Sequence, residues 1–366
     1  MARTYNNLWD AIIDFEHLYN SYRSAKRGKR YRHESLNFAE DLEVNLITLQ
    51  NELIWNMYNP LPLRQFYVFE PKKRLISAPA FRDRVVHHSL VKVIEPLFQK
   101  KFIKETFACI VGRGTHAAVH HVESCARKAK RLWGKYYVLK CDIRKFFPSI
   151  NHDIMKKIIR KTICDYRMLY LIDTVIDSNE MAGRGIPIGS LTSQLFANIY
   201  LNSLDHFIKE QRGIKYYARY MDDFIIIHND KAFLHNLKAE IEDYVRRELD
   251  LIMNPKTGIF AERQGIDFCG YRIWPTHVLP RKSTMKRTKR RLRKFAAVYK
   301  DNPHILKHVT DSIQSFLGYV KHCSGWRSAK SMLDSIIFSG VKAKADRETT
   351  EKWYTPNFRR KALLTK

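Results

Sequence analysis

The sequence predicts a mixed α/β (α+β) fold, in which an antiparallel sheet is backed by helices and followed by a helical C-terminal region. Short apolar runs rich in β-branched and aromatic residues stand at 136–142 and 215–229, between longer stretches whose apolar residues recur at helical spacing. The chain has 366 residues, of which 45% are hydrophobic and 12% aromatic, so it can bury a substantial core. This length allows one large or two to three small folding units.

The predicted elements follow one another without repeats or low-complexity linkers. Helical spacing of apolar residues predicts helices over 5–22, 36–57, 82–98, 151–178, from 190 to about 211, and 231–249. Alternation predicts hairpins over 64–76 and 215–229, a buried strand over 136–142, and short strands near 257–260 and 267–274. Residues 99–135 read as a mixed segment, 183–189 as a glycine-rich loop, and the chain from about 281 as helical and very basic.

The charge balance points to a polyanionic partner. Lys and Arg number 65 against 37 Asp and Glu, which gives a net charge of +28. An anionic membrane would be the competing partner, but the sequence has no run of about 18 apolar residues, and its start lacks a signal-peptide pattern. We therefore expect nucleic acid and no membrane. The six cysteines form no Cys-x-x-Cys pair, which indicates reduced thiols in a cytoplasmic protein.

Three carboxylates form the most informative pattern. Tyr220-Met-Asp-Asp223 is followed by the apolar run Phe224–Ile227, so both acids would lie at the tip of a buried hairpin. Asp142 ends the predicted strand 136–142, and Asn151 can cap the helix that follows. Each acid alone is more often a turn or capping residue. Together they match the carboxylate cluster of a two-metal phosphoryl-transfer site.

The ordered motifs resemble the palm of a reverse transcriptase. They are Asp142-Ile-Arg-Lys-Phe-Phe147, Gly185-Ile-Pro-Ile-Gly189, Tyr220-Met-Asp-Asp223, Asn254-Pro-Lys256 and Phe268-Cys-Gly270. Further segments resemble most the reverse transcriptases of diversity-generating retroelements: Ala25–Arg30, Pro71–Ile76, Asp83–His88, Gly112–His116 and Ile188–Gln194. The resemblance covers nearly the whole chain and is weakest after about residue 281.

The resemblance implies a right-hand polymerase fold with fingers, palm and helical thumb. The expected domains are 1–135 (N-terminal extension and fingers, with part of the palm), 136–280 (palm, with a fingers segment near 155–185) and 281–366 (basic thumb). It implies catalytic Asp142, Asp222 and Asp223, and two Mg²⁺ ions, for which Mn²⁺ could substitute, held by Asp142, Ile143, Asp222 and Asp223. The implied partners are template RNA, a cDNA primer-template, dNTPs and a small basic oligomeric accessory variability determinant protein. A cytoplasmic setting in a prokaryote or phage is expected.

The resemblance also implies a nucleotide-binding set, namely Lys72, Arg74, Phe147, Ile188, Gly189, Gln194 and Lys256. The Arg74 guanidinium would make bidentate hydrogen bonds to the triphosphate. The alternative is that its charge only prevents the edge of the hairpin from pairing with another strand. Phe147 would reject a 2′-hydroxyl, with Phe146 packing inward, unless both are core. Lys256 would lie near the leaving pyrophosphate, or be a solvated surface lysine.

Ile188 and Gln194 depart from the usual pattern, since most reverse transcriptases carry Gln at the first position and Pro at the second. An isoleucine offers only shape to the nascent base pair, which matches a family whose copying errors concentrate at template adenines; neutral apolar packing is the alternative. In the basic run, Arg281, Lys282, Lys286, Arg287, Arg290 and Arg291 would follow the template-primer phosphates.

Three functions follow from these observations. The leading one is an RNA-directed DNA polymerase of a diversity-generating retroelement. A group II intron- or retron-type reverse transcriptase is the second, although nothing in the sequence resembles an endonuclease domain. The third is an RNA-binding scaffold with an inactive polymerase fold, against which stands the retention of Asp142, Asp222, Asp223 and Arg74 together.

Overall fold

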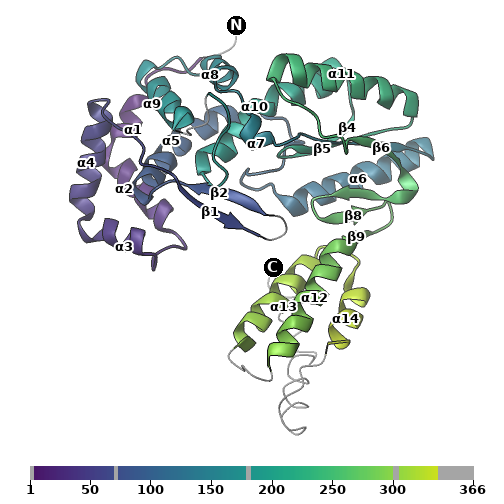
Figure 1. The fold of residues 1–366 in the computed structure, drawn as a ribbon. Helices are drawn as coiled ribbons and strands as arrows, with labels where there is room; N and C mark the ends of the chain where they lie inside the picture. Colours follow the sequence, from purple (N-terminus) through teal and green to yellow (C-terminus); the bar gives the residue numbers. More distant parts are fainter. Residues whose placement is uncertain (1–3, 70–72, 179–182, 300–304, 337–366) are drawn as a thin grey trace. The chain divides into compact units, whose positions relative to one another are not determined.

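The computed structural model describes residues 4–69, 73–178, 183–299 and 305–336 (Figure 1). The chain forms two compact units, residues 1–264 and 265–366, which are described separately below. None of the helices in the described part of the chain is long and apolar enough to cross a membrane.

The first unit begins with helices. In order along the chain they are α1 (Trp9–Ile13), α2 (Phe15–Lys26), α3 (His33–Glu40), α4 (Leu42–Ile54), α5 (Phe81–Gln99), α6 (Thr115–Trp133), α7 (Phe146–Ser149), α8 (His152–Arg160), α9 (Tyr166–Asp177), α10 (Leu191–His206) and α11 (Lys231–Leu249). A π-helical turn, η1 (Phe207–Gln211), continues α10, and a 3-10 turn, η2 (Glu262–Gln264), closes the unit. Helix α5 packs against α2 on one side and α10 on another, and so joins the N-terminal helices to the rest of the unit.

Two antiparallel sheets complete the first unit. Strands β1 (Arg64–Val68) and β2 (Arg74–Ala78) form a separate hairpin. The larger sheet has the order β4-β5-β3-β6, with β3 (Tyr137–Asp142), β4 (Tyr216–Tyr220), β5 (Asp223–His228) and β6 (Gly258–Ala261). Helices α11 and α6 lie on opposite faces of this sheet (Figure 1), which explains why the middle strand β5 reads as an almost continuous apolar run.

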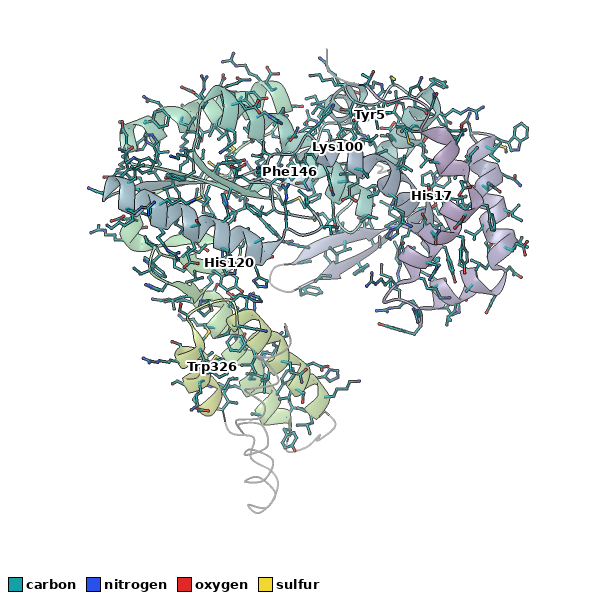
Figure 2. All side chains as sticks on the ribbon, turned by 180° about the vertical axis from the view of Figure 1, so that it is seen from behind. Tyr5, His17, Lys100, His120, Phe146 and Trp326 are labelled. Atoms are coloured by element: carbon teal, nitrogen blue, oxygen red, sulfur yellow. The ribbon has the colours of Figure 1, made fainter. Side chains whose placement is uncertain are left out.

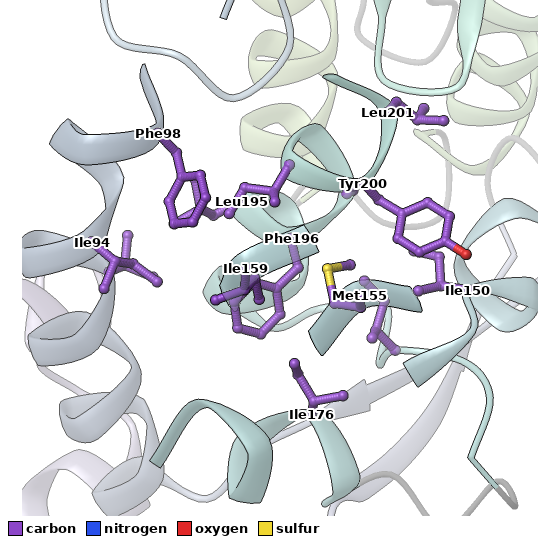
Figure 3. Packing of buried hydrophobic residues seen from close by; sticks show 14 of the residues in the cluster. Ile94, Phe98, Ile150, Met155, Ile159, Ile176, Leu195, Phe196, Tyr200 and Leu201 are labelled. Atoms are coloured by element: carbon purple, nitrogen blue, oxygen red, sulfur yellow. The ribbon is translucent and has the colours of Figure 1, made fainter. Parts of the chain in front are cut away.

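One apolar core fills the first unit. It runs from α1 through α5 and α10 to α11, and Figure 3 shows part of it, where Phe196 of α10 lies beside Met155 and Ile159 of α8 while Leu195 lies toward Phe98 of α5. Figure 2 places Phe146 inside this unit. Because α10 is buried around almost its whole circumference, it fixes the elements that hold the candidate functional residues.

Side-chain caps define where several helices begin. Asn151 Oδ1 accepts hydrogen bonds from the backbone of Asp153 (3.0 Å) and Ile154 (3.3 Å), so the predicted cap of α8 is confirmed. Asp165 caps α9 and also accepts from the backbone N–H groups of Leu8 and Trp9, which fixes the start of the chain against α9. These caps bring the termini of distant helices into fixed positions.

The second unit combines a small sheet with a helical bundle. The sheet contains β7 (Ile266–Phe268), β8 (Tyr271–Ile273) and β9 (Val278–Pro280), paired in that order, and the helices are α12 (Lys282–Tyr299), α13 (Leu306–Val320) and α14 (Trp326–Asp334). Its apolar core is built from Leu292, Phe316, Val320, Ala329, Met332 and Leu333. The rings of Tyr271 and Tyr319 stack at 4.5 Å, which joins the sheet to α13.

The observed architecture confirms the predicted α+β class with antiparallel sheets. Three stretches predicted as helical, 5–22, 36–57 and 151–178, are each divided into two helices. The segment 99–135 contains the long helix α6, which the sequence analysis did not predict. Strand β9 was also missed. All six cysteines are free thiols, as expected. The division into fingers, palm and thumb at residues 135 and 280 stays a prediction.

Candidate functional site

The three predicted acidic residues meet at one edge of the larger sheet. Strand β3 pairs with β5 so that Asp142 lies directly opposite Asp223. Strands β4 and β5 are joined by a two-residue loop, Met221-Asp222, with Tyr220 paired to Asp223. Asp222 is therefore adjacent to this cross-strand pair, and all three carboxylates are partly buried. Residues 80 positions apart in the sequence form one acidic cluster.

Asn254 fixes the Asp142 carboxylate. Its Nδ2 donates to Oδ2 of Asp142 at 2.6 Å, while its backbone N–H donates to the Asp142 carbonyl at 2.7 Å. Thr257 Oγ1 accepts from the Asp142 backbone N–H at 3.4 Å. The sequence analysis had quoted the Asn254-Pro-Lys motif without giving Asn254 a role, because an asparagine before a proline is also a common turn residue.

The acidic cluster is electrostatically crowded. Burial, followed by the nearby charge of Asp142, raises the pKa of Asp222 to about 6. The charge of Arg74 acts on Asp222 in the opposite direction. Lys140 Nζ lies 3.7 Å from Asp223 Oδ2. The cluster thus carries negative charge that a bound cation would stabilise.

A metal site here must be judged by its donors. No group of three or more His, Cys, Asp or Glu side chains that could hold a metal ion is found within the described residues. Mg²⁺, however, keeps several waters and takes only one or two protein carboxylates besides substrate phosphates. The crowded oxygens of Asp142, Asp222 and Asp223 fit that requirement. Ile143 is buried and bridges Met253, so only its main chain could contribute a ligand.

Arg74 and the 183–189 loop are joined through the small hairpin. The backbone N–H of Ser77 in β2 donates to the Ile188 carbonyl at 3.0 Å. Gly189 lies against β2 with φ of 122°, and a Cβ there would stand 2.8 Å from Ile76 Cγ2. The loop therefore needs glycine at 189 both for its backbone conformation and for space. The side chain of Ile188 remains partly exposed and that of Arg74 exposed.

Phe146 and Phe147 differ in burial. Phe146 is 2% exposed and belongs to the core, whereas Phe147 is partly exposed, and their rings meet edge to face at 5.5 Å. The backbone N–H of Ile186 donates to the Phe147 carbonyl at 3.0 Å, which joins this segment to the 183–189 loop. Part of the Phe147 ring is therefore accessible to a ligand, whereas the Phe146 ring is not.

A cavity of about 1260 Å³ opens beside the same loop. Its lining includes the apolar residues Pro148, Pro187 and Ile188 as well as Ser77 and Tyr170. Lys156 and Asp177, which also line it, pair with each other at 2.6 Å. The cavity is large enough for a nucleotide, and its wall mixes apolar side chains with polar ones such as Asn59, Gln65 and Asp173.

The remaining predicted nucleotide contacts are solvent-exposed side chains. Gln194 lies in the first turn of α10, and Lys256 lies in the turn between Asn254 and β6. Lys72 lies outside the described residues. The structure gives Gln194 and Lys256 no feature that separates a nucleotide contact from an ordinary surface residue.

The predicted nucleic-acid contacts lie at the start of the second unit. Lys282, Lys286 and Arg290 of α12 are exposed at a spacing of four, so they share one helix face. Arg287 and Arg291 are partly buried. Arg281 is ion-paired with Asp267, which makes it less available for phosphate.

Sequence reasoning missed a buried polar network beneath the hairpin loop. Arg219 of β4 and Asp205 of α10 are both 0% exposed and form a two-pronged ion pair. The available signal was an arginine within the apolar strand Tyr216–Tyr220, immediately before the acidic loop. A charge buried in a strand is costly unless it is paired, so its presence pointed to a partner elsewhere in the chain.

Comparison with known proteins agrees with this geometry. A family model described as "Reverse transcriptase (RNA-dependent DNA polymerase)" matches residues 70–273. Protein YkfC of Escherichia coli K12 is 27% identical over 274 residues, which cover 63% of this chain and 72% of that protein. The group II intron-encoded protein LtrA of Lactococcus lactis subsp. cremoris is 25% identical over 195 residues, which cover 50% of this chain but only 32% of LtrA.

Among solved structures, apo telomerase from Candida tropicalis matches this chain with a TM-score of 0.47 and 14% identity, covering 79% of this chain and 66% of that one. Telomerase from Candida albicans in complex with a telomeric RNA fragment gives a TM-score of 0.46 at 13% identity, covering 76% and 55%. The matched region therefore covers between about half and two thirds of the length of these two telomerase chains.

Proposed function

Because the chain belongs to the reverse transcriptase (RNA-dependent DNA polymerase) family, we propose that it is the RNA-directed DNA polymerase of a diversity-generating retroelement. In this proposal it copies a template RNA into cDNA whose errors concentrate at template adenines. The supporting observation is the register of β3 against β5, which sets Asp142 opposite Asp223 with Asp222 beside them. A scaffold without activity would not need three acids crowded against one another.

The proposed chemistry is nucleotidyl transfer. Two Mg²⁺ ions, when bound, would lower the pKa of the primer's 3′-hydroxyl and stabilise the charge that develops on the phosphate. Asp142, Asp222 and Asp223 would hold these ions, together with the main chain of Ile143. Asn254 would keep the Asp142 carboxylate in one orientation, since it bonds both its side chain and its backbone. Mn²⁺ could substitute for Mg²⁺.

The incoming deoxynucleotide would be held by residues around this cluster. Arg74, whose charge acts on Asp222, would fork onto the triphosphate. Lys72 and Lys256 would add positive charge, and Lys256 could protonate the leaving pyrophosphate. Phe147 would contact the sugar and exclude a 2′-hydroxyl. Gly189 lets the loop backbone approach the base pair, and the cavity beside Ile188 would admit an unpaired template base.

The assignment to a diversity-generating retroelement depends on Ile188, in the glycine-rich loop 183–189, and on Gln194 in α10; we call this loop the fidelity loop. Ile188 stands where most reverse transcriptases carry an amide, and Gln194 where most carry proline; both features are similar to the diversity-generating family. That family implies an accessory variability determinant protein, a small basic oligomer, as partner, and a cytoplasmic enzyme of a prokaryote or phage. Template RNA and the cDNA primer-template would lie along the exposed basic face of α12.

A group II intron-type reverse transcriptase is the second candidate, favoured by the 25% identity with LtrA. One experiment separates the candidates: the protein extends a DNA primer on an RNA template of balanced composition, with and without the accessory protein, and the cDNA is sequenced. Errors at template adenines several-fold above those at the other bases support our proposal. Even error rates favour the intron type, and no extension with either Mg²⁺ or Mn²⁺ supports the scaffold.

A further inference from the structure

The loop that carries Asp222 is conformationally strained. Met221 and Asp222 are the only residues between the paired positions Tyr220 and Asp223. Met221 has φ of 58°, a left-handed conformation that two-residue hairpin loops usually assign to Gly, Asn or Asp. Strain of this kind persists only where the surroundings impose it, and it gathers at functional sites.

Arg219 makes the contact that restrains this loop. Its Nη1 donates to the Met221 carbonyl at 3.0 Å and to Asn198 Oδ1 at 3.1 Å. The other prong of the guanidinium faces Asp205: Nε donates to Oδ1 at 2.7 Å and Nη2 to Oδ2 at 2.6 Å. The guanidinium of one buried arginine thus bonds the Met221 carbonyl through Nη1 and Asp205 of α10 through Nε and Nη2, which joins the loop to α10.

The anchor of Arg219 is itself fully bonded. Besides the guanidinium, Asp205 accepts from Tyr217 Oη at 2.7 Å and from Thr106 Oγ1 at 2.9 Å. Asn198 Nδ2 donates to the Ala108 carbonyl at 2.9 Å, and the Arg219 backbone is paired with the segment 105–107. A change of rotamer at Arg219 would therefore break its side-chain bonds to α10 and to the Met221 carbonyl, and a change at Asp205 would break those to β4 and Thr106.

We propose that Arg219, held by Asp205 and Asn198, is a positioning residue that imposes the strained Met221 conformation and so sets the orientation of Asp222 and Asp223. The inference rests on the proposed nucleotidyl transfer. A buried ion pair on its own is weak evidence for a stabilising role, because apolar residues of the same volume often replace such pairs without loss. What an apolar residue cannot supply is the donor that reaches the loop carbonyl.

The first test needs no catalysis. Arg219→Lys keeps the charge beside Asp205, but a single ammonium cannot imitate the planar fork that bonds Asp205 and the Met221 carbonyl together. Hydrogen–deuterium exchange is followed by mass spectrometry on the protein without metal or nucleic acid. We expect at least 10-fold faster exchange in the peptide that contains residues 221–223, and unchanged exchange in the peptides of α5 and α11.

The matched control is Leu234→Ala, which opens a cavity under α11 without touching the loop; Leu234 is 0% exposed. Its thermal midpoint should fall at least as far as that of Arg219→Lys, while exchange at 221–223 stays as in the wild type. Asn198→Ser, which draws the second acceptor away from Nη1, should give a smaller change of the same kind. If Arg219→Lys does not fold, exchange at residues 221–223 in Asn198→Ser tests the proposal in its place.

Metal binding and turnover extend the test. Binding of Mn²⁺ alone, measured by electron paramagnetic resonance, should weaken several-fold in Arg219→Lys and stay unchanged in Leu234→Ala. In primer extension, kcat should fall about 10-fold or more, because small misplacement of reacting groups is expensive, while the Kd for primer-template is unchanged. Rapid exchange spread over the whole protein, or wild-type values at the loop, would overturn the proposal. If the wild-type protein binds Mn²⁺ but extends no primer, the proposed function is overturned. The exchange measurements at residues 221–223 would then still test whether Arg219 positions the loop.

Discussion

At the scale of single residues, two adjacent phenylalanines have opposite environments. Phe146 is in the core, while Phe147 is partly exposed and its backbone is bonded to the 183–189 loop. The family resemblance implied that Phe146 packs inward and Phe147 does not, and the burial of the two rings agrees with it. Whether Phe147 contacts a nucleotide sugar stays a prediction, and it has a direct test.

Phe147→Ala should admit ribonucleotides, because removal of the ring opens the space that a 2′-hydroxyl would need. We expect the ratio of kcat/KM for dNTP over rNTP to fall by about 10-fold or more, which corresponds to about 1.4 kcal/mol. Single-nucleotide incorporation on one primer-template measures both substrates. Phe146→Ala is the control: it should cost about 3–5 kcal/mol of unfolding free energy without a selective gain for rNTPs. Equal losses for both substrates in Phe147→Ala would mean that Phe147 only packs.

Ile188→Gln tests the fidelity loop. A glutamine there could hydrogen-bond near the nascent pair, and one such bond contributes about 1 kcal/mol, enough for a several-fold change in discrimination. Sequencing of cDNA from one RNA template should show fewer errors at adenine, with smaller changes at the other bases. Ile188→Leu, which keeps the apolar character, serves as control. An adenine error rate that does not change in an active Ile188→Gln protein would identify Ile188 as a packing residue and make Gln194 the next residue to test.

At the scale of elements, agreement between sequence and structure followed the strength of the local pattern. Helix α11 begins and ends where predicted because Asp230 caps it and apolar residues mark one face. Helix α6 was missed because its buried face is made mostly of small residues such as Ala118, Ala126 and Ala129. Its glycine boundaries, Gly114 and Gly134, were the signal available.

The parts of the site that sequence could not give are long-range contacts. The alignment of Asp142 with Asp223 depends on the register of two strands about 80 residues apart, which the motif order made plausible but periodicity could not fix. The pairing of Arg219 with Asp205 depends on the packing of β4 against α10. No local sequence pattern identifies which buried acidic residue forms the ion pair with a buried arginine.

Helix α5 makes stability depend on pH. Burial lowers the pKa of His87 from its ordinary 6.5 to about 4, so below pH 6.5 the unfolded chain binds a proton that the folded protein does not. The free energy of unfolding therefore falls as pH drops toward 4. His87→Asn removes this difference in proton binding between the folded and unfolded chains. Between pH 7 and 4.5, the free energy of unfolding should therefore fall by about 2 kcal/mol less in His87→Asn than in the wild type.

Urea unfolding across this pH range measures the difference. Burial also raises the pKa of Asp83 in the same helix, which acts in the opposite direction, but this contribution is present in both proteins and cancels. Parallel pH profiles for the wild type and His87→Asn would show that the imidazole titrates in the folded protein as it does in the unfolded chain.

At the scale of the whole molecule, the net charge of +28 and the exposed basic face of α12 support the proposed contact with phosphates. Replacement of Lys282, Lys286 and Arg290 by Gln should weaken binding to an RNA–DNA primer-template and reduce the slope of log K against log salt by about 2 to 3. Gln at Lys307, Arg327 and Lys330, which are exposed in the same unit, makes the matched control. Equal slopes in the two triple variants would show that α12 carries no special share of the contact.

The central claim is that Asp142, Asp222 and Asp223 form a metal-dependent site for DNA synthesis on RNA. It is tested most directly by primer extension on an RNA template with Mg²⁺, comparing the wild type with Asp222→Asn, which removes one charged oxygen ligand and keeps the side-chain shape. We predict extension by the wild type and a loss of at least 10³-fold in the variant, with its thermal midpoint and primer-template affinity close to those of the wild type. Robust extension by Asp222→Asn would contradict the assignment.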